Sequence, residues 1–174
     1  MKLVLNATPL IHLTRAGLDR VFAMLRDTGA EVFTAPAVLD EIKKGWWTSD
    51  AGVIADLIDR GVVEVRKPED REFLDFLVKI SAMKMLPLHE GEAEVLAIAR
   101  EMGAIAVVDE KAGRMVGRVA GVEVHGTVYL LILLYRKGKL SREGVVDGFK
   151  SMVKTGYRIS PKDYELIMEE LERI

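Results

Sequence analysis

Two strand-like segments of this 174-residue chain each run directly into polar side chains that could do chemistry. The apolar run 3–5 is followed by Asn6, and the apolar run 105–108 is followed by Asp109 and Glu110. In an open parallel sheet with helices on both faces, ligands bind at the carboxyl ends of the strands. The pattern therefore predicts that these three side chains share one edge of a sheet.

A further carboxylate, Glu92, lies on the apolar face of a helix predicted over 90–102. At about 100° per residue it falls within the apolar arc of that helix, whereas Glu94 and Glu101 point to the opposite side, where we expect solvent. A carboxylate that faces a core is costly unless its charge is compensated. The alternative is a solvated position in the first helical turn, where the helix dipole favours an acid.

Two more acids have both a functional and a structural interpretation. Glu41 lies at the border of the apolar arc of a helix predicted over 36–44, where a solvated role is the simpler interpretation for that residue alone. Asp109 could instead be the N-cap of a helix over 111–120. Acids brought together on one sheet edge repel one another unless a cation intervenes. Oxygen ligands favour Mg²⁺ or Mn²⁺, and such an ion supports in-line phosphodiester hydrolysis.

Composition excludes several other classes of protein. The chain has no cysteine, which excludes disulfides, zinc–thiolate sites and cysteine nucleophiles and fits a cytoplasmic location. His12, His89 and His125 do not share a metal-binding spacing. The first apolar run is too short for a signal peptide, and the longest, 128–135, is too short to span a bilayer, so we expect no membrane association.

The charge balance bears on nucleic-acid binding. With 25 basic and 27 acidic residues the net charge is −2, so a broad electrostatic attraction to nucleic acid is not expected. Local basic clusters or metal ions would have to provide any such contact. Lys111 and Arg114, which follow the Asp109-Glu110 pair, are candidates for contacts with phosphate.

The elements that must position these residues follow an alternating pattern. Apolar runs rich in Val and Ile, with little polar alternation, predict strands that are covered on both faces. These runs span 3–5, 31–34, 62–65, 105–108 and 122–124. Helical patterns span 9–13, 18–26, 36–44, 51–60, 69–80, 90–102, 111–120, 127–137, 142–154 and 161–173. The order predicts one α/β domain with right-handed crossovers, in which 1–137 is the core and 138–174 a helical extension.

Short segments in a fixed order resemble the PIN-domain family. They are LVLNATPLI at 3–11, PAVLDEI at 36–42, HEGEAE at 89–94, VVDEKAGR at 107–114 and GVEVHGT at 121–127. The resemblance covers residues 1 to about 137. The Gly-Glu-Ala-Glu form, the Gly-Thr before a leucine-rich helix and the C-terminal helical pair resemble an uncharacterised prokaryotic or archaeal branch of the toxin-like PIN ribonucleases.

The resemblance implies a three-layer α/β/α sandwich with a central parallel sheet and Mg²⁺- or Mn²⁺-dependent endoribonuclease activity. It also implies RNA as substrate and an antitoxin protein as a partner, as in toxin–antitoxin pairs. Transferred residue by residue, it implies that Glu41, Glu92 and Asp109 are the catalytic metal ligands, with Glu110 adjacent to them. The aspartate that the family has on its first strand corresponds to Asn6.

Two smaller transfers and one departure accompany that set. Thr8 matches a hydroxyl position that supports the site, and Arg114 matches an arginine that follows the acids of the fourth strand. Asn6 departs from the family because an amide carries no charge, and its NH₂ group can only donate. We therefore expect weaker metal binding and reduced activity. The alternatives are a catalytically impaired PIN module that binds RNA or a partner protein, and a structural domain whose acids are incidental.

Two apolar features bear on assembly. Trp46 and Trp47 could form a partner or dimer surface or stack on bases, or one of them could pack into the core. A leucine stripe indicates core or a dimer interface and contains Leu130, Leu131, Leu133 and Leu134. Together these features make a homodimer the expected state.

Overall fold

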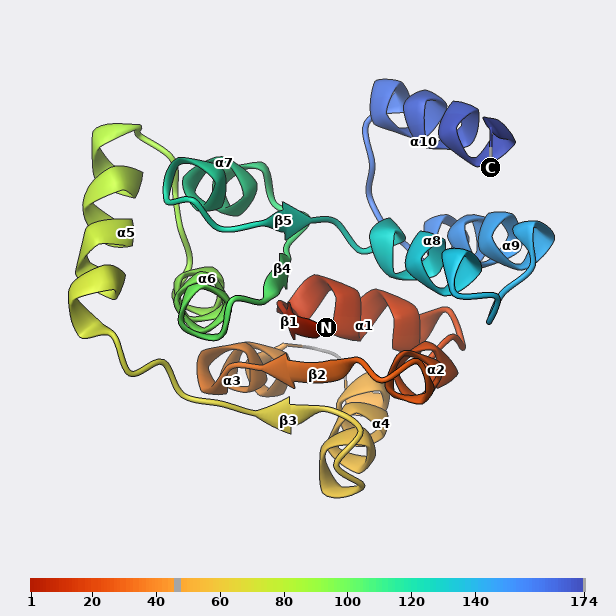
Figure 1. The fold of residues 1–174 in the computed structure, drawn as a ribbon, viewed down its shortest axis with the longest axis horizontal. Coiled ribbons are helices and arrows are strands. Elements are labelled where there is room, and N and C mark those ends of the chain that lie inside the picture. The colour runs from red at the N-terminus through yellow and green to blue at the C-terminus, as the bar shows by residue number, and fades with distance from the viewer. Residues whose placement is uncertain (46–47, 174) are drawn as a thin grey trace.

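The computed structural model describes residues 1–45 and 48–173. In this part of the chain, five parallel strands form one sheet in the order β3-β2-β1-β4-β5 (Figure 1). The strands are β1 Lys2–Leu5, β2 Glu31–Thr34, β3 Glu64–Val65, β4 Ile105–Val107 and β5 Val124–His125. The predicted α/β class with a central parallel sheet is confirmed. β3 and β5 are shorter than predicted, and β5 ends at His125 instead of 124.

The helices lie in the predicted order, with shifted ends. They are α1 Ala7–Arg15, α2 Arg20–Asp27, α3 Pro36–Lys44, α4 Thr48–Asp59, α5 Arg71–Met83, α6 Glu90–Met102, α7 Lys111–Val119, α8 Val128–Arg136, α9 Arg142–Lys154 and α10 Pro161–Arg173. The prediction that the first helix starts at Pro9 is wrong, because α1 begins at Ala7, directly after Asn6. Pro9 is tolerated in the first turn of α1 because the backbone nitrogens of that turn have no acceptor within the helix.

The helices form two layers around the sheet. α6 packs against β1 and β4, α7 packs against β5, and α5 packs on both of these helices. On the other face, α1 packs against β1, α2 packs against β2, and α8 packs on α2 (Figure 1). α3 contacts both α1 and α6, so it joins the two layers beside the strand ends. This arrangement is the predicted α/β/α sandwich.

Strand register determines where the site lies. Leu5 pairs with Thr34 on one side and with Val107 on the other. The backbone nitrogen of Asn6 then donates to the carbonyl of Val107 at 3.1 Å. Because the strands are parallel, the residues that follow them leave the sheet at the same edge. Asn6 and the segment after β4 are therefore neighbours, as predicted.

The leucine stripe of α8 lies in the core. Leu130, Leu131, Leu133 and Leu134 are 0–7% exposed within one chain. They therefore give no support to the predicted homodimer, which stays a prediction, and Trp46 and Trp47 lie outside the described residues. Among the described residues, no helix combines the length and the apolar composition that crossing a bilayer requires.

The C-terminal helices pack on one side of this core. α9 packs on α8 and α1, and α10 packs on α9 (Figure 1). Phe149 and Met152 of α9 are fully buried, so the extension shares the main hydrophobic core. The predicted division at residue 137 stays a prediction.

Candidate active site

Asn6, Thr8 and Glu110 meet where β1 and β4 end. The Thr8 hydroxyl donates to Oε1 of Glu110 at 2.6 Å, and Nδ2 of Asn6 donates to Oε2 of the same carboxylate at 3.3 Å. Asn6 is 3% exposed, and its Oδ1 is buried without a hydrogen-bond partner. The amide thus donates one hydrogen bond to Glu110 and leaves its one acceptor without a donor.

Glu92 is buried in the first turn of α6. It is 2% exposed, and its Oε2 accepts a hydrogen bond from the backbone nitrogen of His89 at 2.9 Å. Its Oε1 is buried and has no hydrogen-bond partner. Burial raises the pKa of Glu92, the His89 N–H opposes that rise, and the charge of Glu110 adds to it. The prediction of a core-facing carboxylate is confirmed, and the alternative of a solvated one is wrong.

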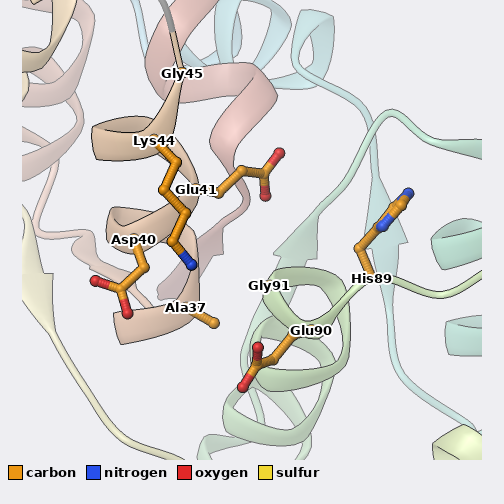
Figure 2. Close-up of a pocket in the computed structure, with 8 residues that line it drawn as sticks. All are labelled: Ala37, Asp40, Glu41, Lys44, Gly45, His89, Glu90 and Gly91. Atoms are coloured by element: carbon orange, nitrogen blue, oxygen red, sulfur yellow. The ribbon is translucent and has the colours of Figure 1, made fainter.

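Glu41 lies on one wall of a pocket of about 460 Å³ between α3 and the start of α6. Figure 2 shows its carboxylate extending from α3 into the space between the two helices, with His89 and Glu90 on the opposite wall. The side chain as a whole is exposed. Partial burial of its carboxyl group nevertheless raises the pKa of Glu41, and the charge of Glu110 raises it further.

Two glycines allow the acidic side chains to come close. A Cβ on Gly91 would lie 3.3 Å from Oε2 of Glu41 and 3.5 Å from Oδ1 of Asn6. A Cβ on Gly113 of α7 would lie 2.5 Å from Oε1 of Glu92. α7 can therefore approach Glu92 this closely only because position 113 lacks a side chain, whereas a Cβ at position 91 would be a tight contact.

Glu94 has a role that the sequence pattern did not predict. It was expected to face solvent, but it is half-buried and accepts a hydrogen bond from the backbone nitrogen of Ala37 at 2.9 Å. Ala37 lies in the first turn of α3, where backbone donors have no partner within the helix. This bond fixes α3 against α6 and so fixes Glu41 relative to Glu92.

Asp109 forms a separate network. It accepts hydrogen bonds from the backbone nitrogen of Thr127 at 2.9 Å, from the Thr127 hydroxyl, and from the Tyr157 hydroxyl at 2.5 Å. Burial raises the pKa of Asp109, and these donors oppose the rise. The alternative that Asp109 caps α7 is wrong, because the N-cap residue is Glu110.

The structure thus separates the predicted site residues into two groups. Asn6, Thr8 and Glu110 are bonded to one another, whereas Asp109 is bonded to Thr127 and Tyr157. The charge of Glu110 raises the pKa values of Glu41, Glu92 and Asp109 alike. Within 1–45 and 48–173, no three His, Asp or Glu side chains are already arranged to hold a metal ion.

Lys111 and Arg114 lie on the other side of Asp109. Together with Asp109 and Tyr157 they line a groove of about 1110 Å³. Lys111 is exposed and Arg114 is half-buried. Both predicted phosphate-binding residues are therefore accessible to a ligand in that groove.

Sequence reasoning missed Tyr157 as a member of the site. It is 8% exposed and lies between α9 and α10, far along the chain from Asp109. Its ring also contacts the ring of His12 at 5.3 Å between centroids. The only sequence signal was an aromatic residue in the short connection 155–160, and that signal does not identify a partner.

Comparison with known proteins agrees with this fold. The structure is similar to VapBC-1 from nontypeable Haemophilus influenzae, with a TM-score of 0.55 and 12% identity over 73% of this chain and 98% of that one. It is also similar to VapBC2 from Rickettsia felis bound to a DNA fragment from their promoter, with a TM-score of 0.56 and 12% identity over 72% of this chain and 98% of that one.

A third similar structure is PAE2754 from Pyrobaculum aerophilum, with a TM-score of 0.50 and 13% identity over 78% of this chain and 99% of that one. At these identities the likeness shows the fold alone. No curated protein matches the sequence. The family model DUF3368, described as a PIN domain, matches residues 2–173. This chain therefore belongs to the PIN-domain family.

Proposed function

We propose that this protein is a metal-dependent endoribonuclease of the PIN type. In this proposal Asn6, Glu92 and Glu110 hold a Mg²⁺ or Mn²⁺ ion, with Glu41 at the open side of the site. The observation that supports it best is a pair of buried acceptor atoms without donors, Oδ1 of Asn6 and Oε1 of Glu92. Four buried side-chain polar atoms of the described residues lack a hydrogen-bond partner, and these two are the ones that lie at the proposed site, the others being Nδ1 of His12 and Oγ1 of Thr14 on α1. Buried acceptors are nearly always satisfied in folded proteins, so two unsatisfied oxygens at one site favour a cation there.

The charges at the site support the same proposal. The pKa values of Glu41 and Glu92 are both raised by burial, and Glu110 adds to both shifts. Carboxylates that raise one another's pKa values are stabilised when a cation lies between them. Oxygen atoms from amide and carboxylate groups are the ligands that hard divalent cations prefer. The residues present therefore fit such an ion.

The chain's own residues have distinct tasks in this proposal. When bound, the ion would hold a phosphate oxygen and lower the pKa of a water molecule. Thr8 and Asn6 fix the orientation of Glu110 by their hydrogen bonds. The raised pKa of Glu41 suits it to accept a proton from the attacking water.

Asp109 takes a different role from the one expected by resemblance. Its oxygen atoms already accept hydrogen bonds from Thr127 and Tyr157. We assign the ligand position after β4 to Glu110 and treat Asp109 as a positioning residue that ties β4 to α8 and to the C-terminal extension. This assignment departs from the resemblance, which implies Asp109 as the ligand and Glu110 as its neighbour.

An antitoxin protein is the partner that we propose. The sequence resembles toxin-like PIN ribonucleases, and the fold is similar to two VapBC proteins. A small protein encoded directly upstream of this chain and copurifying with it would support the proposal. The cytoplasmic location and the homodimer stay predictions.

The test is cleavage of a labelled single-stranded RNA in Mg²⁺, in Mn²⁺ and in EDTA. Glu92→Gln and Glu110→Gln should each abolish cleavage, because each removes a charge from the site and conserves its shape. Glu72→Gln is the matched control, since Glu72 is exposed on α5. Cleavage that survives both site substitutions would come from a contaminant and would overturn the proposal.

The second candidate is a catalytically impaired PIN module, and Asn6 is the observation that favours it. Calorimetric titration with Mg²⁺ separates the possibilities. Metal binding without cleavage, together with cleavage by Asn6→Asp, would establish impairment. If no metal binds to either protein, the acids are incidental to the function.

A further inference from the structure

A basic groove lies beside the acidic site. It has a volume of about 1110 Å³ and is bordered by α7, by β5 and α8, and by the segment 157–167 that includes the start of α10. Its lining holds two acids, Asp109 and Asp163, against six basic residues. The six basic residues are Lys111, Arg114, Arg118, Arg136, Arg158 and Lys162. In a chain with a net charge of −2, this is a strong local excess of positive charge.

The basic residues of the groove are free to bind an anion. In the described part of the chain, none of the six forms an ion pair, whereas Arg15 is paired with Asp50 at 2.8 Å and Arg26 with Glu64 at 3.0 Å. All but Arg114 are exposed. Unpaired cations gathered along one groove favour a ligand with several negative charges.

The wall of the groove also carries a pair of stacked rings. His125 at the end of β5 and Tyr129 of α8 lie parallel, with centroids 4.0 Å apart and an interplanar angle of 12°. Both residues are half-buried and both line the groove. Aromatic rings next to cations are typical of sites where unpaired bases stack and phosphates are neutralised.

The groove reaches the acidic site through consecutive residues. Asp109 lines the groove, and the next residue, Glu110, is bonded to Asn6 and Thr8. Tyr157 donates to Asp109 and also lines the groove, so the C-terminal extension forms part of the wall next to the acids. A ligand in the groove therefore ends beside the proposed metal ligands.

We propose that a single-stranded RNA lies along this groove, with phosphates against the arginines of α7 and the basic residues of 158–162 and with a base on the His125–Tyr129 pair. The proposal rests on the proposed nuclease function and deepens it, because it assigns substrate binding to the C-terminal extension. A duplex fits less well, since its bases are already stacked on one another. An acidic peptide would use the cations but would leave the ring pair without a role.

Binding is measured on the full chain in EDTA, where no cleavage occurs, by fluorescence anisotropy of a labelled single-stranded RNA. The double variant Arg118→Glu/Lys162→Glu reverses charge on two walls of the groove. We expect it to weaken binding by about tenfold or more and to reduce the salt slope by about two. The control Arg20→Glu/Lys150→Glu makes the same charge change at exposed positions outside the groove and should stay within about twofold of wild type.

Stacking is tested separately at Tyr129. Tyr129→Ala should weaken RNA binding by about tenfold, and Tyr129→Phe should restore it because the ring is kept. RNA that carries 5-iodouracil should cross-link to Tyr129 or His125 under ultraviolet light. Thermal melts identify any variant that has not folded. For such a variant, the position of the cross-link in the wild-type protein tests the proposal instead.

The outcomes separate this proposal from the proposed nuclease function. If the groove variant loses RNA binding and the wild type does not cleave RNA, the groove proposal stands and the nuclease proposal is overturned. If the wild type cleaves RNA and both double variants bind RNA equally well, the groove proposal alone is overturned. A cross-link outside the groove would overturn the groove proposal in the same way. Binding of poly-glutamate in place of RNA would identify an acidic protein as the ligand and would also overturn it.

Discussion

The acidic site and the basic groove lie on opposite sides of two consecutive residues, Asp109 and Glu110. On the acidic side, buried acceptor oxygens of Asn6 and Glu92 have no donors. On the basic side, the six basic side chains of the groove form no ion pair with the described residues. The acidic side therefore has acceptor oxygens without donors, and the basic side has cations without paired anions. The separation suits a site that binds a cation on one side and a polyanion on the other.

The two regions also differ in how firmly their side chains are held. On the acidic side, Glu92 and Glu110 are fixed by hydrogen bonds, from the backbone nitrogen of His89 and from the Thr8 hydroxyl respectively, and Glu41 is exposed. The groove uses long, exposed arginine and lysine side chains. Fixed side chains suit a metal site, which needs a defined geometry. Long exposed cations suit the binding of a flexible polyanion such as single-stranded RNA. Substitutions on the acidic side and at its boundary with the groove test this difference.

The largest effect is expected from Gly113→Ala. The new Cβ would lie 2.5 Å from Oε1 of Glu92 and 2.7 Å from Cγ1 of Val108. An alanine in a helix is ordinarily more favourable than glycine by about 1 kcal/mol, but overpacking here should cost about 1–3 kcal/mol. Displacement of Glu92 should reduce Mg²⁺-dependent cleavage by about 100-fold. Chemical denaturation and the cleavage assay measure the two effects.

Gly117→Ala is the matched control in the same helix. Its Cβ would lie 2.5 Å from Cγ2 of Val124 and 2.8 Å from Cδ2 of Leu96, both in the core. We expect a similar loss of stability with Mg²⁺ affinity retained. If the two variants lose metal affinity equally, the effect of Gly113→Ala is general destabilisation and does not act through Glu92.

Asn6→Asp should change metal affinity and stability in opposite directions. A carboxylate adds a charge to the ligand set, so Mg²⁺ affinity should rise by about tenfold, or about 1.4 kcal/mol. In EDTA the same change replaces a donor to Glu110 with a second negative charge and should lower stability by about 1 kcal/mol. Calorimetry with Mg²⁺ and denaturation in EDTA measure these effects.

Asn6→Ala provides the reverse comparison, because it removes the free acceptor that the proposal assigns to the ion. Its Mg²⁺ affinity should fall below that of wild type. Equal affinity in wild type, Asn6→Asp and Asn6→Ala would mean that position 6 does not contact the ion.

Tyr157→Phe acts where the two regions meet. The variant removes the hydroxyl that donates to Asp109 at 2.5 Å and leaves an enclosed carboxylate with one donor fewer. We expect a loss of about 1 kcal/mol in stability and faster amide exchange over 157–167. Tyr164→Phe is the control, since the ring keeps its stacking on Phe149. Equal exchange in both variants would show that Asp109 does not hold the extension.

Much of the fold was predictable because it follows from local patterns. Uninterrupted apolar runs identify strands that are buried on both faces, and β1 shows this with Leu3, Val4 and Leu5 all 0% exposed. The helical wheel of α6 placed Glu92 in the core correctly, since burial depends on a periodicity that the sequence records. The ends of helices were less predictable, as at Ala7, because a proline in the first turn permits several starts.

The site was only partly predictable, because adjacent residues at a strand end can point in opposite directions. Sequence patterns placed Asp109 and Glu110 at the right edge, but Asp109 faces Thr127 and Tyr157 while Glu110 faces Asn6. Tyr157 lies 48 positions from Asp109, and no local pattern encodes that contact. The basic groove was unpredictable for the same reason, because its cations come from separate segments that only the folded chain brings together.

The smallest effect is the pH dependence of stability in the absence of metal. Burial raises the pKa of Glu92 above its ordinary value of 4.5, so the folded protein binds this proton more tightly than the unfolded chain. The resulting stabilisation is complete below pH 4.5 and is lost as pH rises through the higher folded pKa. In EDTA, Glu92→Gln should therefore be more stable than wild type at pH 7 by about 0.5 kcal/mol, with no difference at about pH 4.

Glutamine is suited to this comparison because its side-chain oxygen can still accept the hydrogen bond from the backbone nitrogen of His89. Glu72→Gln, at an exposed position on α5, should show no such pH dependence. Saturating Mg²⁺ should reverse the order at pH 7, since an ion that binds only the folded wild type stabilises it by mass action. An order that stays the same in Mg²⁺ and in EDTA would remove Glu92 from the set of metal ligands, because its burial would then serve the fold alone.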